Sequence, residues 1–103
     1  MKSNHPNENV EIVVLPGTDG EACRATDRRK IETLIKDKLL LTSKETYHKV
    51  QVEVERAPDG SPKALVAFLL RAYTFTADVV RVNVDANYKV KSIKPLSSGD
   101  AKA

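Results

Sequence analysis

The sequence lacks several of the features on which whole classes of function depend. It has one cysteine, Cys23, so neither an intrachain disulfide nor a zinc site built from several cysteines is expected. It has no tryptophan, and its four glycines are scattered without forming a phosphate-binding loop. No apolar run approaches the length of about 18 residues that a transmembrane helix needs. The N-terminus lacks the apolar stretch of a secretory signal, which favours a cytoplasmic protein.

What is present is the composition of an ordinary globular domain. Of the 103 residues, 41% are hydrophobic and 30% are charged, which suffices for one modest core. The formal net charge is +3, and residues 63–103 hold seven basic against three acidic side chains. This imbalance permits an acidic partner without requiring one. The polar segments 1–9 and 96–103 predict flexible tails around a single domain over residues 10–95.

The first half of the domain predicts a strand followed by a helix. Residues 10–15 are mostly β-branched and end at Pro16-Gly17, as is typical of a short strand. From residue 26 or 27 to residue 41, apolar side chains repeat at helical spacing, with Thr26 or Asp27 as the N-cap. The predicted helical stripe consists of Ile31, Leu34, Ile35 and Leu39, with Lys38 at its edge.

From Tyr47 onward the apolar period changes from 3.6 to two, which predicts strands. In residues 47–56, Val50, Val52 and Val54 share one face. Further strands are expected at 63–75, around 78–85 and from Tyr88 onward, with turns at Asp59-Gly60 and at Asn87, which can take a positive φ. The sequence therefore predicts an α+β fold: one helix packed on a curved four- to five-stranded antiparallel sheet, in the order strand, helix and four strands.

The segment 63–75 differs from the other strands because both of its faces are apolar. We expect the even positions Val66, Phe68 and Leu70 to meet the helix, in line with the even-numbered valines of the neighbouring strands. The odd positions would then form an apolar patch on the far side of the sheet, and monomers rarely expose a large patch of that kind. The predicted partner interface consists of Leu65, Ala67, Leu69, Tyr73, Phe75 and Val79.

The chain's own N-terminal strand or tails, a second copy of the chain, or a different protein could cover this patch. If a partner covers the patch, the chain is a non-enzymatic interaction module. It would then act as a homodimer or bind a different protein. An inhibitor or immunity-type protein that binds a foreign enzyme is a further alternative.

The order of elements resembles the cystatin-like fold, in which a curved antiparallel sheet wraps one helix. The segment QVEVE at residues 51–55 is similar to the Gln-x-Val-x-Gly segment of cystatins at Gln51, but Glu53 and Glu55 replace the other two key residues. Residues 71–96 are similar in style to the small N-terminal domains of copper amine oxidases and to PepSY-type modules. These resemblances imply a fold and no catalytic activity.

Nucleic-acid binding is the second functional hypothesis. Arg81, Lys89 and Lys91 are expected on one sheet face, and Lys94 would extend this basic patch. Sheets that bind single strands use exposed aromatic side chains for stacking, and the aromatic candidates are Tyr73 and Phe75.

Residues with catalytic or ligating chemistry are few. Cys23 precedes the predicted helix, where backbone N–H groups and Arg24 could lower a thiol pKa, but the sequence favours a plain loop cysteine. His5 and His48 have no metal-ligand spacing. The paired carboxylates of Glu53 and Glu55 are more typical of a solvated sheet face than of an acid–base site. No metal, cofactor or small-molecule substrate is expected.

Overall fold

A computed structural model describes residues 6–15, 25–74 and 76–97 of the chain. It contains one helical segment and one five-stranded sheet, which confirms the predicted α+β class and the predicted order of elements. No helix in the described ranges is long and apolar enough to cross a membrane. The strands are β1 (Glu11–Val14), β2 (Tyr47–Arg56), β3 (Pro62–Arg71), β4 (Ala77–Val84) and β5 (Val90–Ser97), and the helical segment comprises α1 (Ala25–Ile35) and η1 (Lys36–Leu40).

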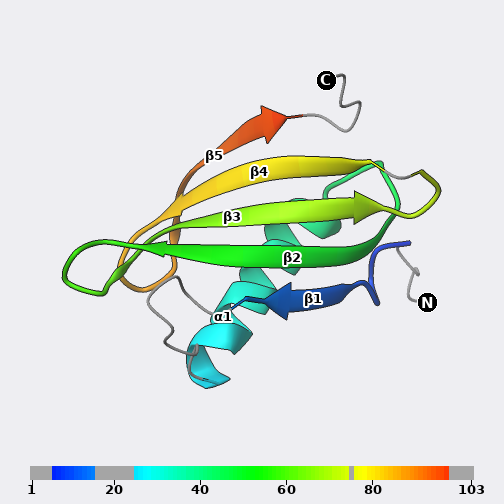
Figure 1. Ribbon diagram of the computed structural model, residues 1–103. Helices are drawn as coiled ribbons and strands as arrows, with labels where there is room; N and C mark the ends of the chain where they lie inside the picture. Colours follow the sequence, from blue (N-terminus) through cyan, green and yellow to red (C-terminus); the bar gives the residue numbers. More distant parts are fainter. Residues whose placement is uncertain (1–5, 16–24, 75, 98–103) are drawn as a thin grey trace.

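The sheet is mixed rather than wholly antiparallel. Its strands lie in the order β1-β2-β3-β4-β5, and β1 pairs with β2 in parallel, with Glu11 beside Lys49 and Val14 beside Val52. The arrows of β1 and β2 point the same way, and α1 passes behind the sheet between them (Figure 1). The helical crossover returns the chain to the end from which β1 started, so β2 must run parallel to it. The first strand thus departs from the antiparallel sheet that the cystatin-like resemblance implies.

The helix begins at Ala25, so Thr26 and Asp27 lie inside its first turn and neither is the N-cap. It ends in the π-helical turn η1, in which the Leu41 N–H donates to the Lys36 carbonyl at 2.9 Å. In a regular α-helix, Leu40 would lie about 180° around the axis from Ile31. The wider turn brings Leu40 into the core beside Ile31 and Ile35, all with 0% exposure, whereas Lys38 is exposed.

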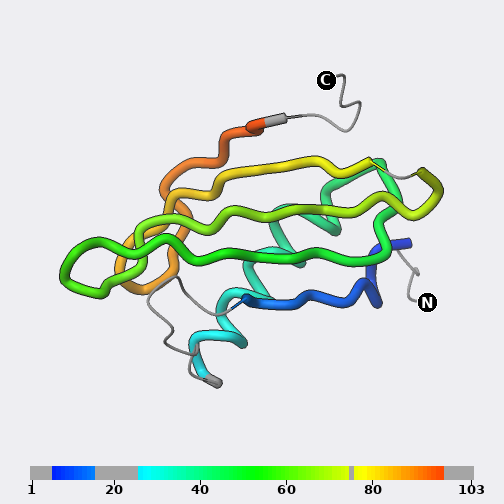
Figure 2. The backbone as a smooth tube through the Cα atoms, viewed as in Figure 1, coloured from blue at the N-terminus to red at the C-terminus, as the bar shows by residue number. Residues whose placement is uncertain are grey.

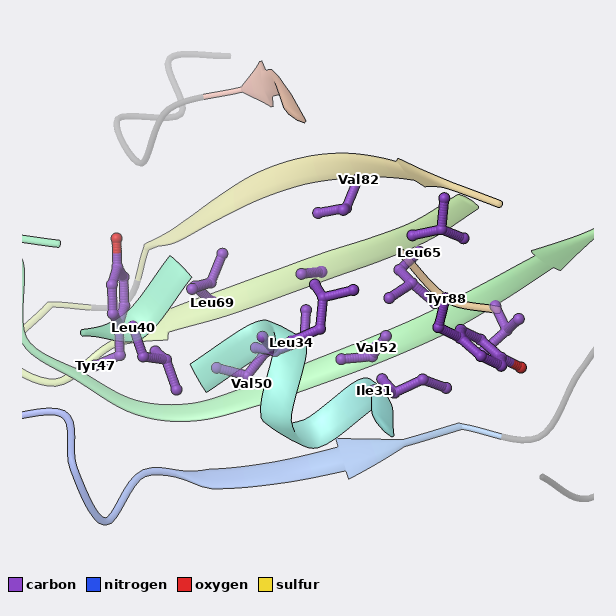
Figure 3. Packing of buried hydrophobic residues seen from close by; sticks show 14 residues of the cluster. Ile31, Leu34, Leu40, Tyr47, Val50, Val52, Leu65, Leu69, Val82 and Tyr88 are labelled. Atoms are coloured by element: carbon purple, nitrogen blue, oxygen red, sulfur yellow. The ribbon is translucent and has the colours of Figure 1, made fainter. Parts of the chain in front are cut away.

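The core lies between this helix and one face of the sheet (Figure 3). The helix contributes Ile31, Leu34, Ile35 and Leu40, and β2 contributes its even-numbered valines, as predicted. Val82 and Val84 of β4 are buried on the same side. From β3, however, the core takes the odd positions Leu65, Ala67 and Leu69.

The prediction for the faces of β3 is therefore wrong, and a β-bulge explains the inversion. At the start of the hairpin Arg56 pairs with Pro62, but the next pair is Glu55 with Ala64, which leaves Lys63 as an extra residue on β3. A shift of one residue moves every later side chain of a strand to the opposite face. Without the bulge the even positions of β3 would have faced the helix. With it, Val50 lies opposite Leu69 and Val54 opposite Leu65.

The two turns that close the hairpins β2–β3 and β4–β5 use different residues for positive φ. Gly60 takes φ 91° in the first, as expected for its Asp-Gly sequence. In the second, Tyr88 takes φ 63°, rather than the predicted Asn87. The Asp85 carboxylate accepts hydrogen bonds from the backbone N–H groups of Asn87 (2.8 Å) and Lys89 (2.9 Å), while the ring of Tyr88 is buried in the core. Packing of the Tyr88 ring in the core therefore holds its backbone in a conformation that is uncommon for a residue with a bulky side chain.

The segment before β1 is attached to the domain through Asn7, although residues 1–9 were expected to form a tail. The side chain of Asn7 is fully buried. Its amide nitrogen donates to the carbonyls of Leu40 (3.0 Å) and Glu45 (2.9 Å), and its oxygen accepts from the Tyr47 N–H (2.8 Å). Asn7 therefore connects the end of η1 to the start of β2.

Candidate functional site

The sheet face turned away from α1 is the candidate site, and we call it the open face. In Figures 1 and 2 the helix lies on the far side of the sheet, so the viewer looks onto the open face. No element in the described part of the chain covers this face. Its side chains come from the odd positions of β2 from Lys49 to Glu55, from the odd positions of β4 and from the even positions of β3, as the strand registers require.

An apolar stripe runs along the middle of the open face. Val66, Phe68 and Leu70 of β3 form its length, and Val79 of β4 lies directly beside Phe68. All four side chains are partly exposed, in contrast to Leu65 and Ala67 on the other face of β3, which have 0% exposure. Because these four neighbouring apolar side chains remain partly exposed on one face of the sheet, the stripe is the candidate interaction site.

The predicted interface residues are thus distributed over several places. Leu65, Ala67 and Leu69 are core residues and cannot contact a partner. Tyr73 is 86% exposed but lies in the loop between β3 and β4, and Phe75 lies outside the described residues. Only Val79 is both on the face opposite the helix and partly exposed. The prediction missed Val66, Phe68 and Leu70, because only the bulge assigns them to the open face.

A polar network lies at one end of the open face. The Arg81 guanidinium donates to Glu55 Oε1 at 2.6 Å and to Asn83 Oδ1 at 3.0 Å. The Asn83 amide donates in turn to the Ser92 hydroxyl at 2.9 Å. The hydrogen bond from Arg81 lowers the pKa of the Glu55 carboxyl. Arg81 is therefore already neutralised within the chain.

Several charged side chains on the open face have no such partner, and two of them, Glu53 and Lys94, lie in the row of Val66 and Arg81. Glu53 lies beside Val66 on the β2 side, and Lys94 lies beside Arg81 on β5. Both are exposed, and neither forms an ion pair or side-chain hydrogen bond with any residue that the structure describes. In this row the open face thus carries an unpaired acid on one flank of the stripe and an unpaired base on the other, while Lys49 lies further along β2, beside Leu70, and also forms no ion pair with a described residue.

The predicted basic patch is only partly assembled. Arg81 and Lys94 are paired neighbours on the open face. Lys91 lies at a register shift between the pairs Asn83–Ser92 and Val84–Val90, and Lys89 precedes β5 in the turn. Since Arg81 is bound to Glu55, Lys94 is the one member of this group that offers an unpaired charge on the described open face.

A second polar cluster lies at the end of the sheet near the loop from β3 to β4. The Tyr47 hydroxyl donates to Asp78 Oδ2 at 2.5 Å, and Arg71 donates to both oxygens of Asp78, at 3.2 and 3.0 Å. Burial and the hydrogen bond to Asp78 raise the pKa of Tyr47 to about 12. Arg71 also lies 3.5 Å from Glu45. Because these groups satisfy one another and Tyr47 stays protonated at neutral pH, the cluster is structural.

Neither metal-binding nor nucleophilic chemistry is assembled elsewhere in the described ranges. They hold no group of three or more His, Cys, Asp or Glu side chains placed to bind a metal. A shallow groove of about 340 Å³ lies between β1 and α1, lined by Val10, Ile12, Thr33, Glu8, Glu32 and Lys36. It contains no histidine or cysteine. Cys23, the candidate thiol, and His5 lie outside the described residues, and His48 is an exposed side chain on β2.

The open face therefore combines the apolar and the unpaired charged side chains that an interaction surface needs. Comparisons of the chain with protein-family models, with curated proteins and with solved structures gave no match.

Proposed function

We propose that the chain is a non-enzymatic interaction module that binds protein through the open face of its sheet. The observation that carries the proposal is the partly exposed apolar stripe of Val66, Phe68, Leu70 and Val79, which no described element covers. Burial of apolar surface contributes roughly 25 cal/mol per Å², so covering this stripe would favour association.

The surroundings of the stripe also support a protein partner. Protein interfaces typically have an apolar centre with aromatic residues and a polar rim. Here Phe68 occupies the middle of β3, and Gln51, Glu53 and Arg81 flank the stripe on the neighbouring strands. A partner that covers Phe68 would leave the flanking polar groups at the edge of the contact.

Photo-crosslinking from single positions tests this proposal. A photoreactive phenylalanine analogue replaces Phe68 in one variant and Tyr73 in a matched control, since Tyr73 is an aromatic residue that is 86% exposed but lies off the open face. We expect irradiation to give a protein adduct from position 68 and none from position 73. Equal adducts from both positions, or none from position 68 at any protein concentration, would contradict the proposal.

Nucleic-acid binding is the second candidate, and the adjacency of Arg81 and Lys94 is the observation that favours it. The ion pair between Arg81 and Glu55 weakens this candidate, because it leaves little net positive charge on the open face. The nucleic-acid hypothesis predicts that the chain binds single-stranded oligonucleotides, that the affinity decreases with salt, and that binding is lost in Lys94→Glu. No binding at low ionic strength would eliminate it.

A further inference from the structure

The charges on the open face are arranged with opposite signs on opposite sides of the apolar stripe. One row of neighbours across the sheet reads Glu53, Val66, Arg81 and Lys94, from β2 to β5. Adjacent strands lie about 4.8 Å apart, so the backbones of Glu53 and Arg81 are roughly 10 Å apart across the sheet. The Arg81 side chain spans β3 to bind Glu55 and not Glu53, which leaves Glu53 without an ion pair among the described residues. This row is therefore self-complementary: it has an acidic end, an apolar middle and a basic end.

We propose that the partner of the open face is a second copy of this chain, packed face to face about a twofold axis that runs parallel to β3. This inference rests on the proposed function and names its partner. Such an axis places β2 of one copy over β4 of the other and keeps each row at the same level along the strands. Glu53 then faces Arg81 and comes within reach of Lys94 of the second copy, and the apolar stripes lie against each other. Packed sheets of this kind are about 10 Å apart, with strands aligned to within about 30°.

The other simple twofold arrangement has its axis perpendicular to the strands, which places β2 over β2. With that axis at the level of Phe68, the middle of the stripe, Glu53 faces Lys49 of the second copy and Arg81 faces Ala77. Only the parallel axis brings Glu53 within reach of Lys94 of the second copy, so variants at these two positions distinguish the two arrangements. In the parallel-axis arrangement Lys49 lies over Ala77, the uncharged neighbour of Leu70 on β4.

The size of the open face indicates how tightly two copies would bind. Four strands about 4.8 Å apart and about eight residues long present on the order of 500 Å² per copy. Two copies would bury on the order of 1,000 Å² in total, near the lower limit for a specific interface. The dimer is therefore expected to dissociate in the micromolar range rather than to be permanent.

A charge-exchange experiment tests both the partner and the orientation. Sedimentation velocity at low ionic strength is measured for Glu53→Lys and for Lys94→Glu, each alone and as an equimolar mixture. Each variant alone places like charges opposite one another, so we expect its dimer to be at least about tenfold weaker than the wild type. In the mixture, a heterodimer has two complementary pairs, and its affinity should return to within about threefold of the wild type.

Control variants separate this effect from a general change of charge. Asp37→Lys and Lys30→Glu exchange the same charges at exposed positions of the helical segment, away from the open face, and should leave the dimer unchanged. Phe68→Asp should abolish the dimer while circular dichroism shows an unchanged fold.

The outcomes distinguish this inference from the function on which it rests. A dimer that is lost in Phe68→Asp, but not restored by mixing the two charge variants, overturns the orientation and leaves the open face as an interface. A monomer at all concentrations that still forms Phe68-dependent adducts with another protein overturns self-association alone. A dimer that is insensitive to Phe68→Asp overturns both proposals.

Discussion

The side-chain oxygen of Asn7 accepts a hydrogen bond from the backbone N–H of Tyr47 at 2.8 Å. This contact connects the segment before β1 to the first residue of β2, and the Asn7 amide nitrogen binds two carbonyls beyond it. We expect Asn7→Ala to lower the free energy of unfolding by about 2 kcal/mol, because it removes three hydrogen bonds and leaves the buried Tyr47 N–H without its acceptor. Urea denaturation measures the change. Asn9→Ala, at an exposed neighbouring position, should change stability by less than about 0.5 kcal/mol.

The two faces of β3 should respond differently to substitution. Leu69→Ala removes a core side chain that is 2% exposed, and we expect it to cost about 3 kcal/mol of unfolding free energy. Phe68→Ala, on the partly exposed open face, should cost only about 1 kcal/mol when the chain is monomeric. Chemical denaturation at low protein concentration compares them. The reverse order of the two effects would show that β3 presents its even positions to the helix after all.

Stability should fall at alkaline pH through Tyr47. Its folded-state pKa of about 12 exceeds the ordinary value of 10.0, because burial and the hydrogen bond to Asp78 favour the neutral phenol. The resulting stabilisation of roughly 2 kcal/mol is fully present below about pH 10 and is lost as the pH rises through about 12. Tyr47→Phe should remove this alkaline loss, whereas Tyr73→Phe, at an exposed position, should not. Denaturant midpoints measured from pH 8 to pH 12 provide the test, and equal alkaline slopes for wild type and Tyr47→Phe would contradict it.

At acidic pH the turn before β5 should weaken through Asp85. Hydrogen bonds from the backbone N–H groups of Lys89 and Asn87 lower the pKa of this carboxyl. Its contribution is therefore present above the ordinary Asp pKa of about 3.9 and is lost as the pH falls through the lower folded-state value. Asp85→Asn keeps an acceptor oxygen but does not titrate, so its stability should depend less on pH between about 5 and 2. If both proteins lose stability in parallel over this range, Asp85 does not contribute in this way.

The strand at residues 47–56 could be predicted to the residue because its valines alternate with polar side chains, and a single face is apolar. The helix could be located from Ile31, Leu34 and Ile35, but the π-helical turn that buries Leu40 has no signal in the spacing of apolar residues. The faces of β3 could not be assigned from its own sequence. Both sets of positions are apolar, so only pairing with β2 decides between them, and one extra residue, Lys63, sets that pairing.

The apolar stripe of the candidate site could therefore be anticipated as a feature of residues 63–75, but not as the side chains of Val66, Phe68 and Leu70. The sequence could not predict which charged side chains remain unpaired either. Whether Arg81 or Lys94 is neutralised within the chain depends on which side chains of β2 lie across the sheet, and this follows from register rather than from composition. Likewise, burial of Asn7 depends on where η1 ends, far along the chain.

The parallel pairing of β1 with β2 has a consequence for the order in which the domain assembles. Strands β2 to β5 follow one another as hairpins, so their contacts close short loops and can form early. Strand β1 has only four residues, and its partner lies beyond the whole helical crossover. We therefore expect β1 to dock last and to open first, so that its amide hydrogens exchange with solvent well before those of β3. The edge of the sheet formed by β1 would then be the place where a second chain of similar sequence could exchange its strand.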